Sequence, residues 1–173
     1  MLRAITIIQP FAALVALPAA DPRHKRCENR RWPTSYRGPL AVHAGKARRY
    51  GGEPCEDIAV DHGVDPNALA FGAIVTVVRM VACVAVEPGP DRRRSIDALG
   101  PGYAWMHDHA HAEGPWCHVY EPVWTPPQPV DCAGKQGLWT VPADVERAVR
   151  AAWYAGVTRR RMPGAAPSTE ATQ

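Results

Sequence analysis

The 173-residue chain lacks any apolar stretch as long as the ~20 residues that a membrane-spanning helix needs. Its first residues do combine a cation at Arg3, an apolar run and the small residues Pro18-Ala19-Ala20, which together resemble a secretory signal. Gln9-Pro10 interrupts that run, and a strand over 4–8 followed by a helix with Pro10 in its first turn accounts for the same residues. We therefore expect a cytoplasmic protein that does not engage a membrane.

Cysteine pairs are lacking as well. The five cysteines are odd in number and widely spaced, and no Cys-x-x-Cys occurs, so neither a disulfide framework nor a zinc ribbon is expected. His107, His109 and His111 alternate along the chain, but they lack the i, i+4 spacing of a helical metal site. Because Asp, Glu and Gly surround them, we interpret this segment as a polar loop. We expect no metal and no other cofactor.

Lysine is scarce, and acidic residues are scarce in one basic segment. Lysine occupies only positions 25, 46 and 135, which leaves 17 arginines among the 20 basic residues. Arginine predominates where phosphate is bound by planar, bidentate contacts, although a GC-rich genome produces the same bias. From Arg23 to Lys46 the chain has seven basic residues and a single acid, Glu28. A solvated face usually mixes its signs, so this pattern favours a pocket that holds a polyanion and a hydrogen-bond donor together.

What remains is typical of a globular chain with many short strands. Apolar and β-branched runs predict short strands over 4–8, 27–31, 40–44, 117–122 and 137–141. One long strand is predicted over 71–87, with a bend near Arg79 that lets it serve two sides of a barrel. Helices are expected over 10–17 and 143–155. Residues 46–62 read as mainly helical with a break at Gly51-Gly52, residues 88–102 as a loop and residues 103–107 as a short strand.

These elements predict a mixed α+β fold, a small β-barrel decorated by helices. We expect the domain to cover 1–156, with the last helix ending at Gly156. Residues 157–173 are basic at first and then rich in small residues and proline. We expect them to form a disordered tail, because they offer little to bury.

Several sequence blocks occur in an order that resembles the ASCH domain, named after activating signal cointegrator homology. These blocks are Ile5–Ala12 with Gln9-Pro10-Phe11, Lys25-x-x-Glu28-x-Arg30-x-Trp32-x-Thr34-x-Tyr36-Arg37-Gly38-Pro39, His43-Ala44-Gly45-Lys46, Phe71–Val75 and Gly134–Trp139. Arg23 stands where the family usually has Gly, and Phe11 where it usually has Trp. The resemblance implies a PUA-like β-barrel with a cleft beside its first helix, into which Lys25, Glu28 and Arg30 face. It also implies an association with RNA or DNA, although relatives include a hydrolase of acetylated cytidine and a described ribonuclease.

The residue types of this segment suit the recognition of a nucleotide. Lys25, Arg30, Arg37 and Lys46 would contact phosphates or carbonyls. Glu28 would accept a hydrogen bond from an exocyclic amino group, as carboxylates do from cytosine N4. Phe11 and Trp32 would stack on bases, at ~1–3 kcal/mol per stacked base. Gln9, Pro10 and His43 complete the candidate set.

Each candidate also has a structural interpretation. Glu28 and Arg30 can form an ion pair that only fixes a loop. Trp32 can be a core residue, and His43 can be a buried histidine with a structural hydrogen bond.

Two functions follow from this pattern. The first is a binding module for RNA, single-stranded DNA or a modified nucleotide, using a basic cleft that carries Lys25, Glu28 and Arg30. The alternative is a hydrolase of an acylated nucleoside or of RNA, in which Lys25 and Glu28 act as an acid/base pair. A protein-interaction module is a third reading. The sequence leaves the oligomeric state open.

Overall fold

The computed structural model describes the chain from Met1 to Arg161, and its side chains as far as Gly156. Its elements in chain order are β1 (Arg3–Ile7), α1 (Phe11–Ala16), β2 (Cys27–Arg30), β3 (Gly38–Ala44), β4 (Arg49–Tyr50), β5 (Glu53–Pro54), α2 (Cys55–Asp61), η1 (Pro66–Ala68), β6 (Ala73–Ala85), η2 (Gly89–Asp91), α3 (Arg92–Ala98), η3 (Pro101–Met106), β7 (Trp116–Trp124), β8 (Val130–Asp131), β9 (Leu138–Thr140) and α4 (Ala143–Arg161). The η elements are 3₁₀ helices.

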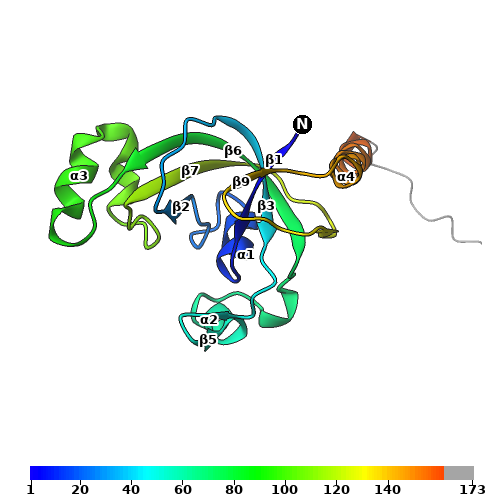
Figure 1. Ribbon diagram of the computed structural model, residues 1–173, viewed down its shortest axis with the longest axis horizontal. Helices are drawn as coiled ribbons and strands as arrows, with labels where there is room; N and C mark the ends of the chain where they lie inside the picture. The colour runs from blue at the N-terminus through cyan, green and yellow to red at the C-terminus, as the bar shows by residue number, and fades with distance from the viewer. Residues whose placement is uncertain (162–173) are drawn as a thin grey trace, which may run out of the picture.

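A strongly curled sheet forms the centre of the fold (Figure 1). Its strand order is β2-β7-β6-β3-β1-β9, and β8 pairs with β6 outside this path. Strands β1 and β3 are parallel, whereas the other neighbours are antiparallel. The expectation of a mixed α+β fold is thus confirmed, with a sheet that curls into a half-barrel and has β2 and β9 at its two edges.

Strand β6 makes the curl possible. It runs from Ala73 to Ala85 and pairs with β3 along its first part and with β7 along its last. Its register shifts against β7 between Val77 and Val78 and between Met80 and Ala82. Such irregularities increase the local twist and bend a strand, which confirms the predicted bent strand with exposed Arg79 near its middle.

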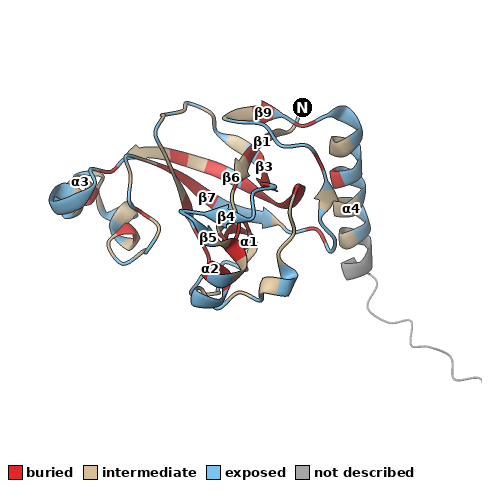
Figure 2. Cartoon of the chain, turned by 60° about the horizontal axis from the view of Figure 1, so that its bottom comes forward, coloured by how far each residue is buried: buried red, intermediate tan, exposed pale blue. Residues whose placement is uncertain are grey.

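Helices pack on both faces of the sheet, and buried residues occur along its central strands among partly exposed ones (Figure 2). Helix α1 places Ala12 and Val15 in a core with β1, β3, β6 and β7, because its short sequence is apolar almost all round. Helix α4 packs Val149 on a second core that contains Trp139. Helix α3 lies at the opposite end of the sheet from α4 (Figure 1) and closes a third core through Ile96.

Four local predictions are wrong. Residues 88–102 contain α3 rather than a loop, because the run of three arginines obscured the buried position of Ile96. Residues 103–107 are mostly 3₁₀ helix rather than strand. The segment 46–62 begins with the β4–β5 hairpin, whose turn uses Gly51 and Gly52 at positive φ, and becomes helical only in α2. Helix α4 continues through Gly156 to Arg161.

The remaining part of the predicted tail, 162–173, lies outside the described residues. Within residues 1–161, no helix combines the length and the apolar character needed to cross a membrane.

Candidate functional site

The candidate site lies where the carboxyl ends of the parallel strands β1 and β3 meet. Thr6 is level with His43 and Ile7 with Ala44, so the chain leaves both strands at the same edge of the sheet. Two hollows flank this edge, and they share no lining residue.

The first hollow, called the recess below, has a volume of about 350 Å³. Its wall includes Phe11, Lys25, Glu28, Tyr50, His62 and His111. The second hollow, called the groove below, has a volume of about 690 Å³. Its wall includes Arg30, Trp32, His43, Lys46, Gly134 and Lys135.

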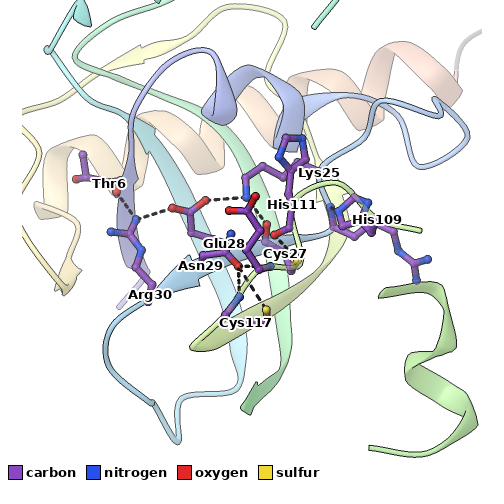
Figure 3. A network of polar contacts seen from close by, with 12 residues as sticks. Thr6, Lys25, Cys27, Glu28, Asn29, Arg30, His109, His111 and Cys117 are labelled. Carbon is purple, nitrogen blue, oxygen red and sulfur yellow. Dashed lines mark hydrogen bonds and ion pairs between the residues drawn. The ribbon is translucent and has the colours of Figure 1, made fainter. Parts of the chain in front are cut away.

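An ion-pair chain of three side chains lies between the two hollows (Figure 3). Lys25 Nζ is 3.0 Å from Glu28 Oε2, and Arg30 Nη2 is 3.4 Å from Glu28 Oε1. Glu28 and Arg30 are two apart on strand β2 and therefore point to the same side. Glu28 faces the recess and Arg30 the groove, so their ion pair joins the two.

Lys25 is held rigidly at the back of the recess. It is only 3% exposed, and its backbone N–H donates to Leu14 O of α1 at 3.1 Å. Its ammonium group donates to Cys27 O and pairs with Glu28. An ammonium has three N–H donors, so these two described partners leave one donor for a ligand in the recess.

Arg30 ties the edge strand β2 to the far side of the site. Its Nη2 donates to Thr6 O at 2.6 Å, and so connects β2 with β1 across the open part of the curl (Figure 3). Its Nε is buried and has no hydrogen-bond partner among the described residues. A buried guanidinium N–H without an acceptor is unfavourable unless a ligand supplies one.

Aromatic rings form the other wall of the recess. The half-buried ring of Phe11 meets Tyr50, His62 and His111 edge to face, with centroid distances of 5.3, 5.7 and 5.7 Å. Lys25 Nζ lies 5.9 Å from the Phe11 centroid, within range of a cation–π contact. The recess thus combines an acceptor, a donor and an aromatic surface.

The loop that carries His109 and His111 covers Lys25 and is fixed in place from two sides. The guanidinium of Arg92 donates to the carbonyl oxygens of Met106, His107, His109 and Ala112. On the other side, Asn29 Oδ1 accepts from the N–H groups of Glu113 and Gly114, each at 3.1 Å. These contacts hold the loop over β2.

The electrostatic surroundings keep both imidazoles of this loop neutral near pH 7. Burial lowers the pKa of His109 to about 4, with smaller contributions from His111 and Lys25. Burial also lowers the pKa of His111 to about 4, with smaller contributions from Lys25 and His62. A neutral imidazole offers one donor and one acceptor, so His111 presents an uncharged polar group to the recess.

We expect the protein to lose stability as the pH falls from about 6.5 towards about 4. In this window the unfolded histidines bind protons that the folded ones exclude, so the free energy of unfolding decreases with falling pH. Urea unfolding at about pH 7 and about pH 5 measures the difference, and the variant H109N/H111N should show a shallower dependence. An equally steep dependence in that variant would contradict the assignment.

The structure brings seven of the ten predicted site residues to these two hollows. Phe11, Lys25 and Glu28 line the recess, whereas Arg30, Trp32, His43 and Lys46 line the groove. His43 is buried, and its Nε2 donates to Cys132 O at 2.9 Å. It is therefore also the buried histidine with a structural hydrogen bond that the sequence offered as an alternative.

The other three candidates lie elsewhere. Gln9 is fully buried, donates to Ala70 O at 2.7 Å and accepts from the Ala13 N–H at 3.0 Å, so it fixes the start of α1. Pro10 is buried and directly precedes that helix. Arg37 is exposed and donates to Thr34 O and Tyr36 O of its own turn.

Sequence reasoning did not select several residues that line the two hollows, among them Tyr50, His62 and His111 in the recess and Lys135 in the groove. The position of Lys135 follows from the pairing of β9 with β1, which brings the preceding loop to the edge occupied by Thr6. Two signals were available: lysine is scarce in this chain, and Lys135 lies in the block Gly134–Trp139 singled out from the sequence.

No protein-family model matches the chain, and a search of curated proteins finds no match. Among residues 1–161, no three His, Cys, Asp or Glu side chains are grouped so as to hold a metal ion.

Proposed function

We propose that the protein binds a nucleobase of single-stranded RNA or DNA, or of a modified nucleotide, in the recess. The observation that carries this proposal is the Lys25–Glu28 pair, with its atoms 3.0 Å apart, in a wall that also contains aromatic rings. A carboxylate beside an ammonium matches a base edge that carries an amino donor beside an acceptor, as cytosine and adenine do.

Shape and surroundings support the same ligand class. The volume of about 350 Å³ is at the lower end of the ~300–1,000 Å³ of small-molecule sites, which suits a base or a nucleoside. The rings of Phe11 and Tyr50 offer apolar surface on which a base can stack. The half-barrel, with the recess beside α1, also supports our proposal that the fold is PUA-like and the domain of the ASCH type. On the sequence grounds given above we assign it to the cytoplasm.

Binding should be visible in tryptophan fluorescence, because Trp32 lines the groove together with Arg30, which pairs with Glu28 of the recess. We expect F11A to bind about tenfold more weakly, since a stacked base contributes ~1–3 kcal/mol. The matched control is F71A, which removes the only other phenylalanine, half-buried outside both hollows. Titration with the four nucleosides and with short oligonucleotides at low salt measures both. No response to any of these ligands, or an equal loss in F71A, would contradict the proposal.

A hydrolase remains the second candidate, because Lys25 and Glu28 are in contact and both face the recess. For an N-acylated base, Glu28 would take a proton from water while the hydroxide attacks the acyl carbon. Lys25 would stabilise the oxyanion, and the C–N bond would break as Glu28 returns the proton to the leaving nitrogen. Incubation of the protein with acetylated cytidine tests this step, because released acetate would identify an enzyme.

A further inference from the structure

The groove has an unbalanced positive charge. Arg30, Lys46 and Lys135 contribute to its wall, and none of its lining residues is acidic. Within the described part of the chain, neither lysine forms an ion pair. Among the described residues, Glu28 is the one carboxylate that pairs with Arg30, and Arg30 shares it with Lys25. The groove therefore has more cationic donors than the described residues satisfy.

The positions of these cations are determined by the fold. The stem of Lys46 crosses Gly72, where a Cβ atom would be 2.9 Å from Lys46 Cε and where φ is +68°. Thr6 Oγ1 donates to Lys135 O at 2.8 Å and so fixes the backbone of the second lysine. Gly134 lies directly against His43, with room for no side chain. Two glycines thus allow the walls of the groove to approach each other closely.

The groove also offers a buried donor and a ring. Arg30 Nε is buried without a described partner, and Arg30 itself lies between Thr6 and Glu28 (Figure 3). Trp32 is half-buried in the same wall, where His118 meets its ring edge to face at a centroid distance of 4.7 Å. Guanidinium and ammonium donors next to an indole suit a ligand that alternates phosphates and flat rings.

We propose that the groove binds the phosphates of a single-stranded oligonucleotide whose neighbouring base occupies the recess. This inference rests on the proposed function and specifies its ligand: a strand, which crosses the Glu28–Arg30 ion pair from the recess to the groove, instead of a free nucleoside. Arg30, Lys46 and Lys135 contact the phosphate oxygens, and Trp32 stacks on a second base.

The test compares K46Q/K135Q with the wild-type protein. Binding of a labelled single-stranded RNA of about 12 nucleotides is followed by fluorescence anisotropy across a salt series. Three phosphate contacts give a slope of about −2 in log K against log salt, and loss of two contacts reduces it to about −0.7. The control R93Q/R94Q removes two exposed charges from α3, at the far end of the sheet. Nucleoside binding and the binding of inorganic phosphate are measured for the same proteins.

A reduced slope in K46Q/K135Q, with nucleoside binding retained and the control unchanged, supports the groove as the phosphate site. An equal reduction in R93Q/R94Q overturns it, because attraction would then be spread over the surface. If nucleosides bind but the oligonucleotide binds no more tightly than they do, the phosphate site in the groove is rejected, whereas the base site in the recess is retained. Inorganic phosphate that binds the groove while the strand does not makes it a site for free anions and overturns the proposal. If neither the nucleosides nor the oligonucleotide bind, both the proposed function and the phosphate site in the groove are rejected.

Discussion

Replacing Glu28 by glutamine should lower the free energy of unfolding by about 3 kcal/mol. Lys25 is 3% exposed, and Glu28 carries the carboxylate that compensates its charge at 3.0 Å. In E28Q the ammonium stays buried beside Arg30 without a negative partner. The expected loss of stability is at the lower end of the range for broken buried ion pairs, because the Glu28 side chain is still 15% exposed to solvent. Urea denaturation of E28Q and wild type measures it.

The control for E28Q is E113Q. Glu113 lines the same recess and is exposed, and its carboxylate makes no ion pair with any described residue. E113Q should therefore change stability by less than about 0.5 kcal/mol. The double variant K25M/E28Q should recover part of the loss, because it removes the buried ammonium, whereas Arg30, which also loses Glu28, keeps its hydrogen bond to Thr6 O and some solvent exposure. An E28Q variant as stable as E113Q would contradict the buried ion pair.

Replacing Gly114 by alanine should destabilise the protein by at least about 3 kcal/mol. Gly114 has φ +83°, and an added Cβ would lie 1.9 Å from the carbonyl oxygen of Val86. That oxygen belongs to the backbone, so a side-chain rotation does not relieve the clash. The loop carrying His111 over the recess would have to move, and its hydrogen bonds to Asn29 would be lost. Thermal unfolding of G114A and wild type tests this.

Gly100 provides the matched control for G114A. Its φ is +91°, close to that of Gly114, but an added Cβ would have no heavy atom within 4 Å. G100A therefore measures the unfavourable backbone conformation without a clash, at about 1–3 kcal/mol. If G114A and G100A reduce the free energy of unfolding equally, the close contact between Gly114 and the carbonyl oxygen of Val86 does not determine the position of this loop, and the prediction is contradicted.

Much of the fold was readable from local patterns. The strands β1, β2, β3, β6 and β7 follow from runs of β-branched and apolar residues, and the bend in β6 from its length. Helix α3 was missed because its only fully buried side chain, Ile96, follows three arginines and belongs to a core formed by distant strands. The end of α4 was misplaced because Gly156 fits within the helix.

The sequence predicted only the part of the site whose residues are neighbours along the chain. Lys25, Glu28 and Arg30 could be grouped because they are neighbours in sequence, and β2 places the last two on one side of the sheet. That Glu28 and Arg30 serve two different hollows depends on the curl of the sheet and on Thr6 in another strand. His111 and Lys135 arrive from loops more than 80 residues away, which no local pattern shows.

The central claim is that a base enters the recess beside Phe11, Lys25 and Glu28. Intermolecular NOEs between labelled protein and an unlabelled single-stranded trinucleotide test it most directly. We expect NOEs from the ring protons of Phe11 to base protons in the wild type and in K46Q/K135Q, and their loss in E28Q. A bound trinucleotide whose base protons show NOEs only to residues outside the recess, such as Trp124 of β7 or Trp153 of α4, would contradict it.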